Sequence, residues 1–359
     1  MRAKQVALLV SSLLFLVLGS LPALAQLQVS APDGSSLKFG ILGQFQGESI
    51  DSTNGVDTST NLFFRRLRLL GGFKLNDNFS FYLDTDNPNL GKGNADGTKN
   101  NADTFIQTAV ATFTFAKEFQ IDAGMILMAQ SYNHNQSAAT LLAVDYGAYT
   151  FNETTPTTGR TGRDYGVQAR GYLAGDQLEY RLGVFQGNRG PESKNDMRVA
   201  GRLAWYVFGP ETGLFYRGTS LGKTQTLSIG GSFDKQQDYS SYGGDLFWDQ
   251  PFGGGNGFTL QVDVTTVDGG KFLLTLPKQT DTLVEAGIYI NSAHLQPFIQ
   301  YSNENFDKST LADEKRTGGG LAYYFNGHNS NLKAQLNVID KNGAKKRNQF
   351  LLQYQVFVF

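Results

Sequence analysis

The sequence predicts an all-β fold, a membrane-spanning antiparallel β-barrel of about sixteen strands, and three observations lead to it. Segments with alternating apolar and polar side chains recur from residue 37 to the last residue. Short and long connections between these segments alternate. No stretch after residue 25 approaches the roughly eighteen apolar residues that a transmembrane helix needs.

Each alternating segment has one apolar face and one polar face, as a half-buried strand should. Between residues 66 and 74, for example, the odd positions carry Leu67, Leu69 and Phe73, whereas the even positions carry Arg66 and Arg68. Charge at so many mid-strand positions would be costly in the interior of a soluble barrel. It costs little where the interior is water and the exterior is lipid. An exported β-sandwich with one wet face remains the alternative.

The connections support the barrel, because short periplasmic turns and longer extracellular loops alternate in outer-membrane barrels. Five connections of about three residues each, such as 76–78 and 326–328, lie between longer polar ones, the longest of which is 128–160. Fourteen or eighteen strands stay possible because the connections 209–222 and 249–257 are irregular. Separately, the sequence does not decide which face of strand 104–115 points outward. The expected strands are 36–49, 62–75, 79–87, 104–115, 119–127, 161–173, 177–187, 197–208, 222–234, 240–249, 257–267, 282–290, 294–303, 316–326, 330–340 and 347–359.

The first 25 residues are expected to be a cleaved export signal, followed by one barrel domain over 26–359. Arg2 and Lys4 precede an apolar run over 6–18, and small residues at 23 and 25 suit cleavage before Gln26. Without this signal the formal charge is −3, and no basic run suggests a nucleic-acid partner. The chain has no cysteine, which excludes disulfides and thiolate metal sites.

Aromatic residues beside short turns are typical of the girdles at the two lipid–water boundaries of a barrel. Phe73 and Phe79 flank one turn, and Phe115 and Phe119 flank another. The chain also ends on Phe359 at the close of an alternating segment, which resembles the terminal signal of bacterial outer-membrane barrels. We therefore expect the outer membrane of a Gram-negative-type cell, with its lipid as a partner.

Several segments resemble the phosphate-selective porin O and P family. They are Phe64-Arg65-Arg66-Leu67-Arg68-Leu69, Gly162-Arg163-Asp164-Tyr165-Gly166-Val167-Gln168, Tyr180-Arg181-Leu182-Gly183-Val184-Phe185-Gln186-Gly187-Asn188 and Arg198-Val199-Ala200-Gly201-Arg202-Leu203. The resemblance implies a homotrimeric, sixteen-stranded pore whose third extracellular loop folds inward to form the constriction. It also implies that arginines along the wall give an anion preference. The arginines at inferred lumen positions are Arg66, Arg68, Arg170, Arg181, Arg198 and Arg202.

The expected function is passive diffusion of small hydrophilic solutes with a mild preference for anions such as phosphate. Residues 128–159 contain no Lys or Arg, so they do not supply the dense row of donors that phosphate specificity needs. The arginines could equally be solvated lumen charges, some paired with Glu179 or Asp84.

No enzyme, cofactor or metal site is expected. The three histidines, His134, His294 and His328, are too scattered for a metal cluster. Two other classes stay open: a plugged barrel that serves as an adhesin or scaffold, and a barrel-type hydrolase, which would need a Ser–His pair on one wall.

Overall fold

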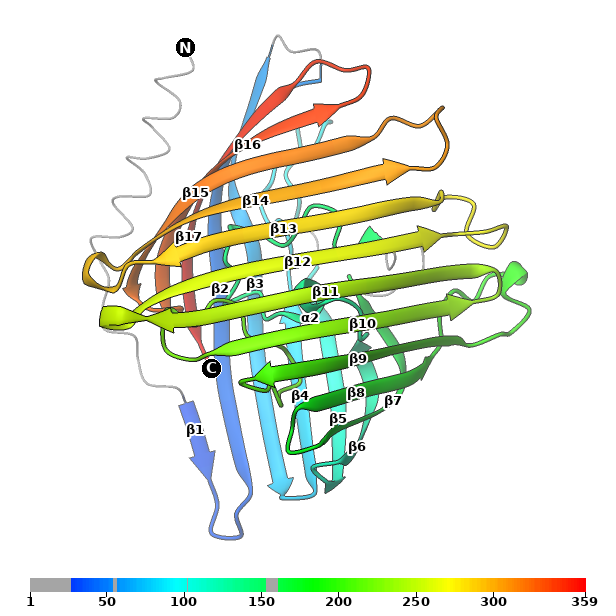
Figure 1. The fold of residues 1–359 in the computed structure, drawn as a ribbon, viewed down its shortest axis with the longest axis vertical. Coiled ribbons are helices and arrows are strands. Elements are labelled where there is room, and N and C mark those ends of the chain that lie inside the picture. The colour runs from blue at the N-terminus through cyan, green and yellow to red at the C-terminus, as the bar shows by residue number, and fades with distance from the viewer. Residues whose placement is uncertain (1–26, 54–56, 102, 153–160) are drawn as a thin grey trace.

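The protein forms a closed antiparallel β-barrel of sixteen strands, β2 to β17, in the computed structural model (Figure 1). The structure describes residues 27–53, 57–101, 103–152 and 161–359, so the expected export signal lies outside the described residues. The last strand pairs with β2 and closes the barrel. The predicted fold class and strand count are thus confirmed.

A short additional strand, β1, pairs with the first residues of β2. Most observed strand boundaries fall within two or three residues of the predicted ones. The strands are β1 Leu27–Ser30, β2 Ser36–Asp51, β3 Thr58–Asn76, β4 Phe79–Asp86, β5 Phe105–Ala116, β6 Phe119–Leu127, β7 Arg163–Leu173, β8 Leu178–Phe185, β9 Arg198–Phe208, β10 Thr226–Gln236, β11 Tyr239–Phe252, β12 Asn256–Asp268, β13 Gln279–Tyr289, β14 Leu295–Phe306, β15 Glu314–Asn326, β16 Ser330–Lys341 and β17 Arg347–Val358. The helical segments are α2 Tyr132–Asn135, η2 Pro191–Ser193, η3 Gly253–Gly255 and η4 Asn291–Ala293.

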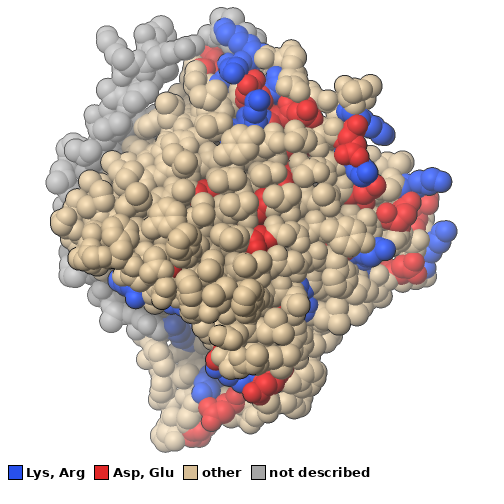
Figure 2. Space-filling view, in the orientation of Figure 1, with Lys and Arg blue, Asp and Glu red and all other residues tan. Residues whose placement is uncertain are grey.

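The outer face of the barrel is apolar and the inner face is polar. Leu182, Leu203 and Ile299 are more than half exposed on the outside, whereas their strand neighbours Arg181 and Arg202 are buried inside. In Figure 2 the middle of the visible face is almost free of charged residues, which gather toward the rims. This is the pattern of a wall between lipid and water. Among the described helices, none is long and apolar enough to cross a membrane.

A β-bulge interrupts the alternation on each of two strands, β3 and β5, which flank β4. Arg65 is an extra residue on β3, because Gln44 of β2 faces Arg66 while the next residue, Phe45, faces Phe64. Gln107 is an extra residue on β5 in the same way. A bulge lets two consecutive side chains point to one side of a sheet. The bulge at Gln107 explains why the outward face of this strand could not be assigned from its sequence.

The alternation of short and long connections reverses once around the barrel. The connection 209–225 lies on the side of the short turns but is long, whereas residues 237 and 238 alone join β10 to β11 on the other side. The prediction of regular alternation is wrong here, and β10 begins at residue 226 rather than 222. The reason is that residues 209–225 enter the lumen instead of forming a tight turn.

Candidate functional site

Residues 128–152, here called the inward loop, lie against the inner wall of the barrel. They belong to the third connection on the side of the long loops, which joins β6 to β7. The Lys333 ammonium donates to the carbonyl oxygens of Leu141, Leu142 and Ala143. The Gln355 amide donates to the carbonyl oxygen of Ala139 at 2.9 Å. Polar side chains of the wall therefore satisfy the backbone of this loop, which has no strand partner.

The connection 209–225 meets the inward loop in the lumen. The Tyr216 N–H donates to the carbonyl oxygen of Asn135, and the Ser137 N–H donates to that of Tyr216, both at 2.9 Å. The Tyr132 ring stacks between those of Phe247 and Tyr216, with centroid distances of 4.1 and 4.8 Å. These contacts fill the part of the lumen that lies beside β8 to β12.

Four of the six predicted arginines lie on the inner wall but do not line the main cavity of the lumen, which is described below. Each is almost fully buried and paired with a carboxylate. Such pairs keep charged groups compensated inside the barrel, because an unpaired buried charge is costly. The pairs are Arg170 with Asp122, Arg181 with Glu179, Arg198 with Asp234 and Arg202 with Asp245.

The other two predicted arginines, Arg66 and Arg68, line a cavity of about 370 Å³ between the inward loop and the opposite wall. We call it the basic cavity. Its walls carry six cationic side chains and three carboxylates, an excess of three positive charges. The cations are Arg65, Arg66, Arg68, Lys92, Arg163 and Arg316, and the carboxylates are Glu48, Asp86 and Asp145.

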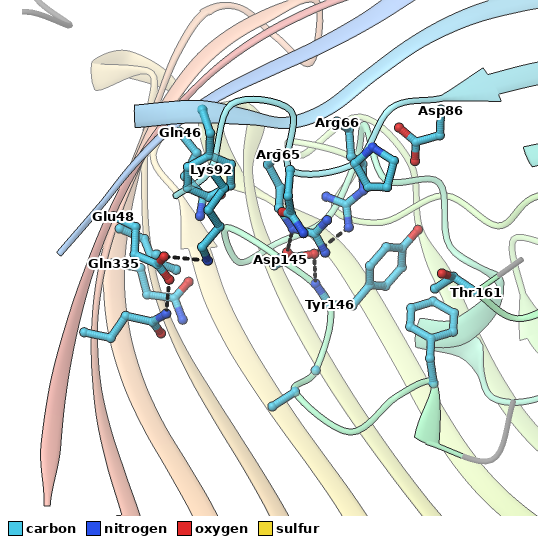
Figure 3. Close-up of a pocket in the computed structure, with 18 of the residues that line it drawn as sticks. Gln46, Glu48, Arg65, Arg66, Asp86, Lys92, Asp145, Tyr146, Thr161 and Gln335 are labelled. Carbon is cyan, nitrogen blue, oxygen red and sulfur yellow. Dashed lines mark hydrogen bonds and ion pairs between the residues drawn. The ribbon is translucent and has the colours of Figure 1, made fainter. Parts of the chain in front are cut away.

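The inward loop contributes one charged group to this cavity, the carboxylate of Asp145. It lies between two guanidinium groups, 2.6 Å from Arg65 Nε and 2.6 Å from an Arg66 nitrogen (Figure 3). Burial alone would raise the pKa of Asp145, but the two guanidinium groups outweigh it and lower this pKa below its ordinary value. Asp145 therefore stays ionised and attaches the loop to β3.

The remaining cations differ in how fully they are compensated. An Arg68 nitrogen lies 2.8 Å from Asp86 and another lies 3.7 Å from Asp84. An Arg316 nitrogen lies 2.7 Å from Glu314, which does not line the cavity. Among the described residues, no carboxylate lies within ion-pair distance of Arg163, whose guanidinium donates to the Thr161 carbonyl at 2.8 Å. Its charge therefore adds to the positive potential of the cavity.

Lys92 reaches the basic cavity from the connection between β4 and β5. Its ammonium lies 2.6 Å from the buried carboxylate of Glu48, and Figure 3 shows it pointing toward that residue. Backbone hydrogen bonds attach this connection to β3: Phe64 N–H donates to the Leu90 carbonyl at 2.9 Å and Asn89 N–H to the Arg65 carbonyl at 3.3 Å. The second long connection is therefore part of the cavity wall.

Sequence reasoning missed four of the six cavity cations. Strict alternation places Arg65 on the lipid face, and only the bulge turns it inward. Arg163 belongs to a segment that resembles the family, but it lies at the very start of its strand, and alternation alone does not assign it to the wall. Nothing in the sequence marks Lys92, a loop residue, or Arg316 at the start of β15. The pair of consecutive arginines at 65 and 66 was the one available signal.

Two of the three histidines lie in buried surroundings. His328 Nε2 lies 2.8 Å from a backbone carbonyl oxygen, that of Thr219, and burial lowers its pKa to about 4. The His134 ring packs 4.7 Å from the ring of Phe151, and burial lowers its pKa well below the ordinary value. Among the described residues, no group of three potential metal ligands occurs.

Comparison with known families agrees with this geometry. The model of the phosphate-selective porin O and P family matches residues 39–227, which is more than half of the chain. The chain belongs to this family. A comparison of this chain with curated proteins finds no match. As a member of the family, it is an outer-membrane porin for small solutes.

Solved porins share the fold at low sequence identity. An anion-selective porin from Comamonas acidovorans is 12% identical, covers 90% of this chain and 99% of its own, and has a TM-score of 0.61. OmpF of Salmonella typhi, solved with daunomycin, is 16% identical, with coverages of 92% and 100% and a TM-score of 0.58. The trimer form of OmpT from Vibrio cholerae is 10% identical, with coverages of 90% and 100% and a TM-score of 0.55. At these identities the likeness establishes the fold.

Proposed function

We propose that this porin is a passive, anion-preferring diffusion channel and that the basic cavity is the narrow part of its path. The observation that carries the proposal is the excess of cations at the cavity: six cations and three carboxylates line it. The cations still exceed the carboxylates by one when Asp84 and Glu314, which pair with Arg68 and Arg316 from outside the lining, are included. A ring of like charge at a constriction concentrates permeant ions of the opposite sign and repels the others. Chloride, phosphate and small carboxylates are the expected solutes.

Positive charge on the wall supports the expected basic wall. The strands and the second connection contribute the six cations, whereas the long third loop, which has no Lys or Arg over 128–159, contributes the carboxylate of Asp145. Phosphate is one candidate solute, because guanidinium groups donate charge-assisted hydrogen bonds to phosphate oxygens. Arg66 and Arg68 keep their proposed role as pore-lining residues. We withdraw that role from Arg170, Arg181, Arg198 and Arg202, which we now assign to support of the wall.

The two other classes receive less support. A plugged barrel would fill the lumen on both sides of the inward loop, whereas here the side facing β2 to β4 keeps a cavity of about 370 Å³. A hydrolase is disfavoured because His328 faces a carbonyl oxygen rather than a serine hydroxyl. We therefore infer a channel without an enzymatic activity.

The proposal also includes how the protein is exported and how it assembles. We infer that residues 1–25 are a signal that is removed during export. We further infer a homotrimer, a proposal supported by the family resemblance and by the trimer form that is named for Vibrio cholerae OmpT. Cross-linking in detergent, followed by mass determination of the mature N-terminus, would test both inferences.

Planar-bilayer recording under a gradient of potassium chloride tests the channel itself. We expect discrete conductance steps and a reversal potential of the sign that chloride selectivity produces. Arg65→Gln should lower the chloride-to-potassium permeability ratio about two- to five-fold, because a unit charge within a few ångströms of an ion in water is worth about 1 kcal/mol. The control is Arg189→Gln, an exposed arginine that forms no part of the cavity wall. Cation selectivity or the absence of steps would refute the proposal.

A further inference from the structure

Three of the cavity cations lie beside an aromatic ring. The Lys92 ammonium lies 4.9 Å from the centroid of the Phe63 ring. The Arg66 guanidinium carbon lies 5.2 Å from that of Tyr146, and that of Arg316 lies 5.7 Å from Tyr149. Each unit pairs a positive charge with an apolar surface, and the three cations belong to different elements: β3, the connection between β4 and β5, and β15.

Of these rings, Tyr146 lines the cavity, and Phe105 and Phe151 line it as well. Phe63 is also a lining residue, but it is only 2% exposed and mainly supports Lys92. The Phe151 ring lies 5.0 Å from that of Tyr146, at an angle of 79°. An inorganic anion gains nothing from such rings, because they offer it no hydrogen-bond donor. A solute that carries its own ring can pack against them and remove apolar surface from water.

We propose that the basic cavity prefers aromatic carboxylates, the benzoate class, over aliphatic carboxylates and inorganic anions. The carboxylate would accept charge-assisted hydrogen bonds from the ammonium or guanidinium group of a unit. The ring would pack beside the aromatic partner of the same unit. This inference names the solute class of the proposed channel and therefore rests on its being anion-preferring.

The cavity and the spacing of its units fit a small solute of this kind. A volume of about 370 Å³ lies at the lower end of the range for small-molecule sites, about 300–1,000 Å³. The Lys92 unit contacts β2 at Glu48, and the Arg66 unit contacts it at Gln44. Four residues of a strand span about 13 Å. A solute released by one unit would therefore reach the next after a short step.

The experiment compares three blockers of the chloride current through the full-length wild-type channel in a planar bilayer. Benzoate and cyclohexanecarboxylate carry the same charge and have similar sizes, but only benzoate is aromatic, and acetate has no ring. We expect the half-blocking concentration of benzoate to be about two- to ten-fold lower than that of cyclohexanecarboxylate, the range that aromatic packing gives. Acetate should block more weakly than either. Inorganic phosphate is the fourth probe, and it should also block more weakly than benzoate.

Leucine substitutions locate the effect. Tyr146→Leu and Phe151→Leu should each reduce the advantage of benzoate over cyclohexanecarboxylate toward one-fold, since both rings line the cavity. Tyr146→Phe keeps the ring and loses only the hydrogen bond from the Tyr146 hydroxyl to the Gln136 carbonyl, so it should keep the advantage. Phe113→Leu makes the same exchange on the exposed outer wall and is the matched control. Chloride steps in each variant verify that the barrel has folded and inserted.

The outcomes separate this inference from the proposed function. An anion-selective channel that does not distinguish benzoate from cyclohexanecarboxylate would overturn the solute class alone. The same holds if phosphate blocks more strongly than benzoate, or if the leucine variants keep the preference for benzoate. A wild-type channel that prefers potassium would overturn both proposals.

Discussion

At the scale of single residues, the balance of charge differs between the two sides of the lumen. On the filled side each of the four arginines Arg170, Arg181, Arg198 and Arg202 has a carboxylate of its own. At the basic cavity, Arg65 and Arg66 share the single carboxylate of Asp145. The local excess of positive charge therefore depends on the partners of each arginine and not only on its inward direction.

Lys92 and Glu48 provide a test of this view. Lys92→Met leaves the Glu48 carboxylate uncompensated in the cavity, so the chloride-to-potassium permeability ratio should fall about two- to five-fold. The double variant Lys92→Met/Glu48→Gln removes the pair without changing the net charge and should restore most of the ratio. Lys99→Met, in the same connection but outside the cavity lining, is the control. Equal ratios in the single and double variants would contradict the pairing.

Asp145 allows a prediction about pH. Its lowered folded-state pKa means that the ion pairs with Arg65 and Arg66 are fully formed above the ordinary aspartate range. Their contribution is lost only as the pH falls through the lowered pKa. The difference in chloride selectivity between wild type and Asp145→Asn should therefore be constant between about pH 8 and pH 5. Reversal potentials of both proteins measure it, and a difference that shrinks over this interval would contradict the assignment.

At the scale of elements, the inward loop depends on side chains of the opposite wall. Lys333 of β16 donates to three consecutive carbonyls of the loop. Lys333→Gln offers fewer donors and should release residues 141–143, which would increase current noise and single-channel conductance. Lys315→Gln on the neighbouring strand is the control, since Lys315 is exposed. Unchanged noise in Lys333→Gln would show that the remaining glutamine contacts hold the loop by themselves.

Gly218 is a point of close approach between the two segments that enter the lumen, where its N–H donates to the Thr140 hydroxyl oxygen at 2.9 Å. A Cβ atom at this position would overlap with the carbonyl oxygen of Thr140 in the inward loop. Gly218→Ala should therefore separate the segments and destabilise the barrel by about 1–3 kcal/mol, the usual cost of overpacking. Urea unfolding in lipid vesicles would measure it, with Gly43→Ala, where a Cβ meets nothing within 4 Å, as the control. Equal stability of the two variants would refute this contact.

At the scale of the whole molecule, the barrel reverses the usual arrangement of a soluble domain, with apolar residues outside and charges inside. Leu203 lies at the middle of β9 and is 53% exposed on the lipid face. Leu203→Lys should cost about 2–4 kcal/mol of folding free energy in a bilayer, whereas a lysine near the rim costs about 0–1 kcal/mol. Leu311→Lys, in the connection before β15, is the rim control. Equal unfolding free energies would place Leu203 outside the hydrocarbon layer.

The sequence by itself determined the wall of the barrel. A strand between lipid and water must alternate apolar and polar side chains along consecutive residues. This local pattern can be read from the sequence, and it predicts all sixteen strands. The same alternation placed Arg66, Arg68, Arg170, Arg181, Arg198 and Arg202 on the inner face, where the structure has them. Local patterns of this kind do not depend on distant parts of the chain.

Only the tertiary structure decided which part of the lumen stays open. That depends on contacts between distant residues, such as Lys333 with the loop at 141–143 and Tyr216 with Asn135. It also depends on two bulges, whose positions follow from pairing between strands and which turn Arg65 and Gln107 into the cavity. Local periodicity carries no information about such pairings, because they are set by packing across the barrel.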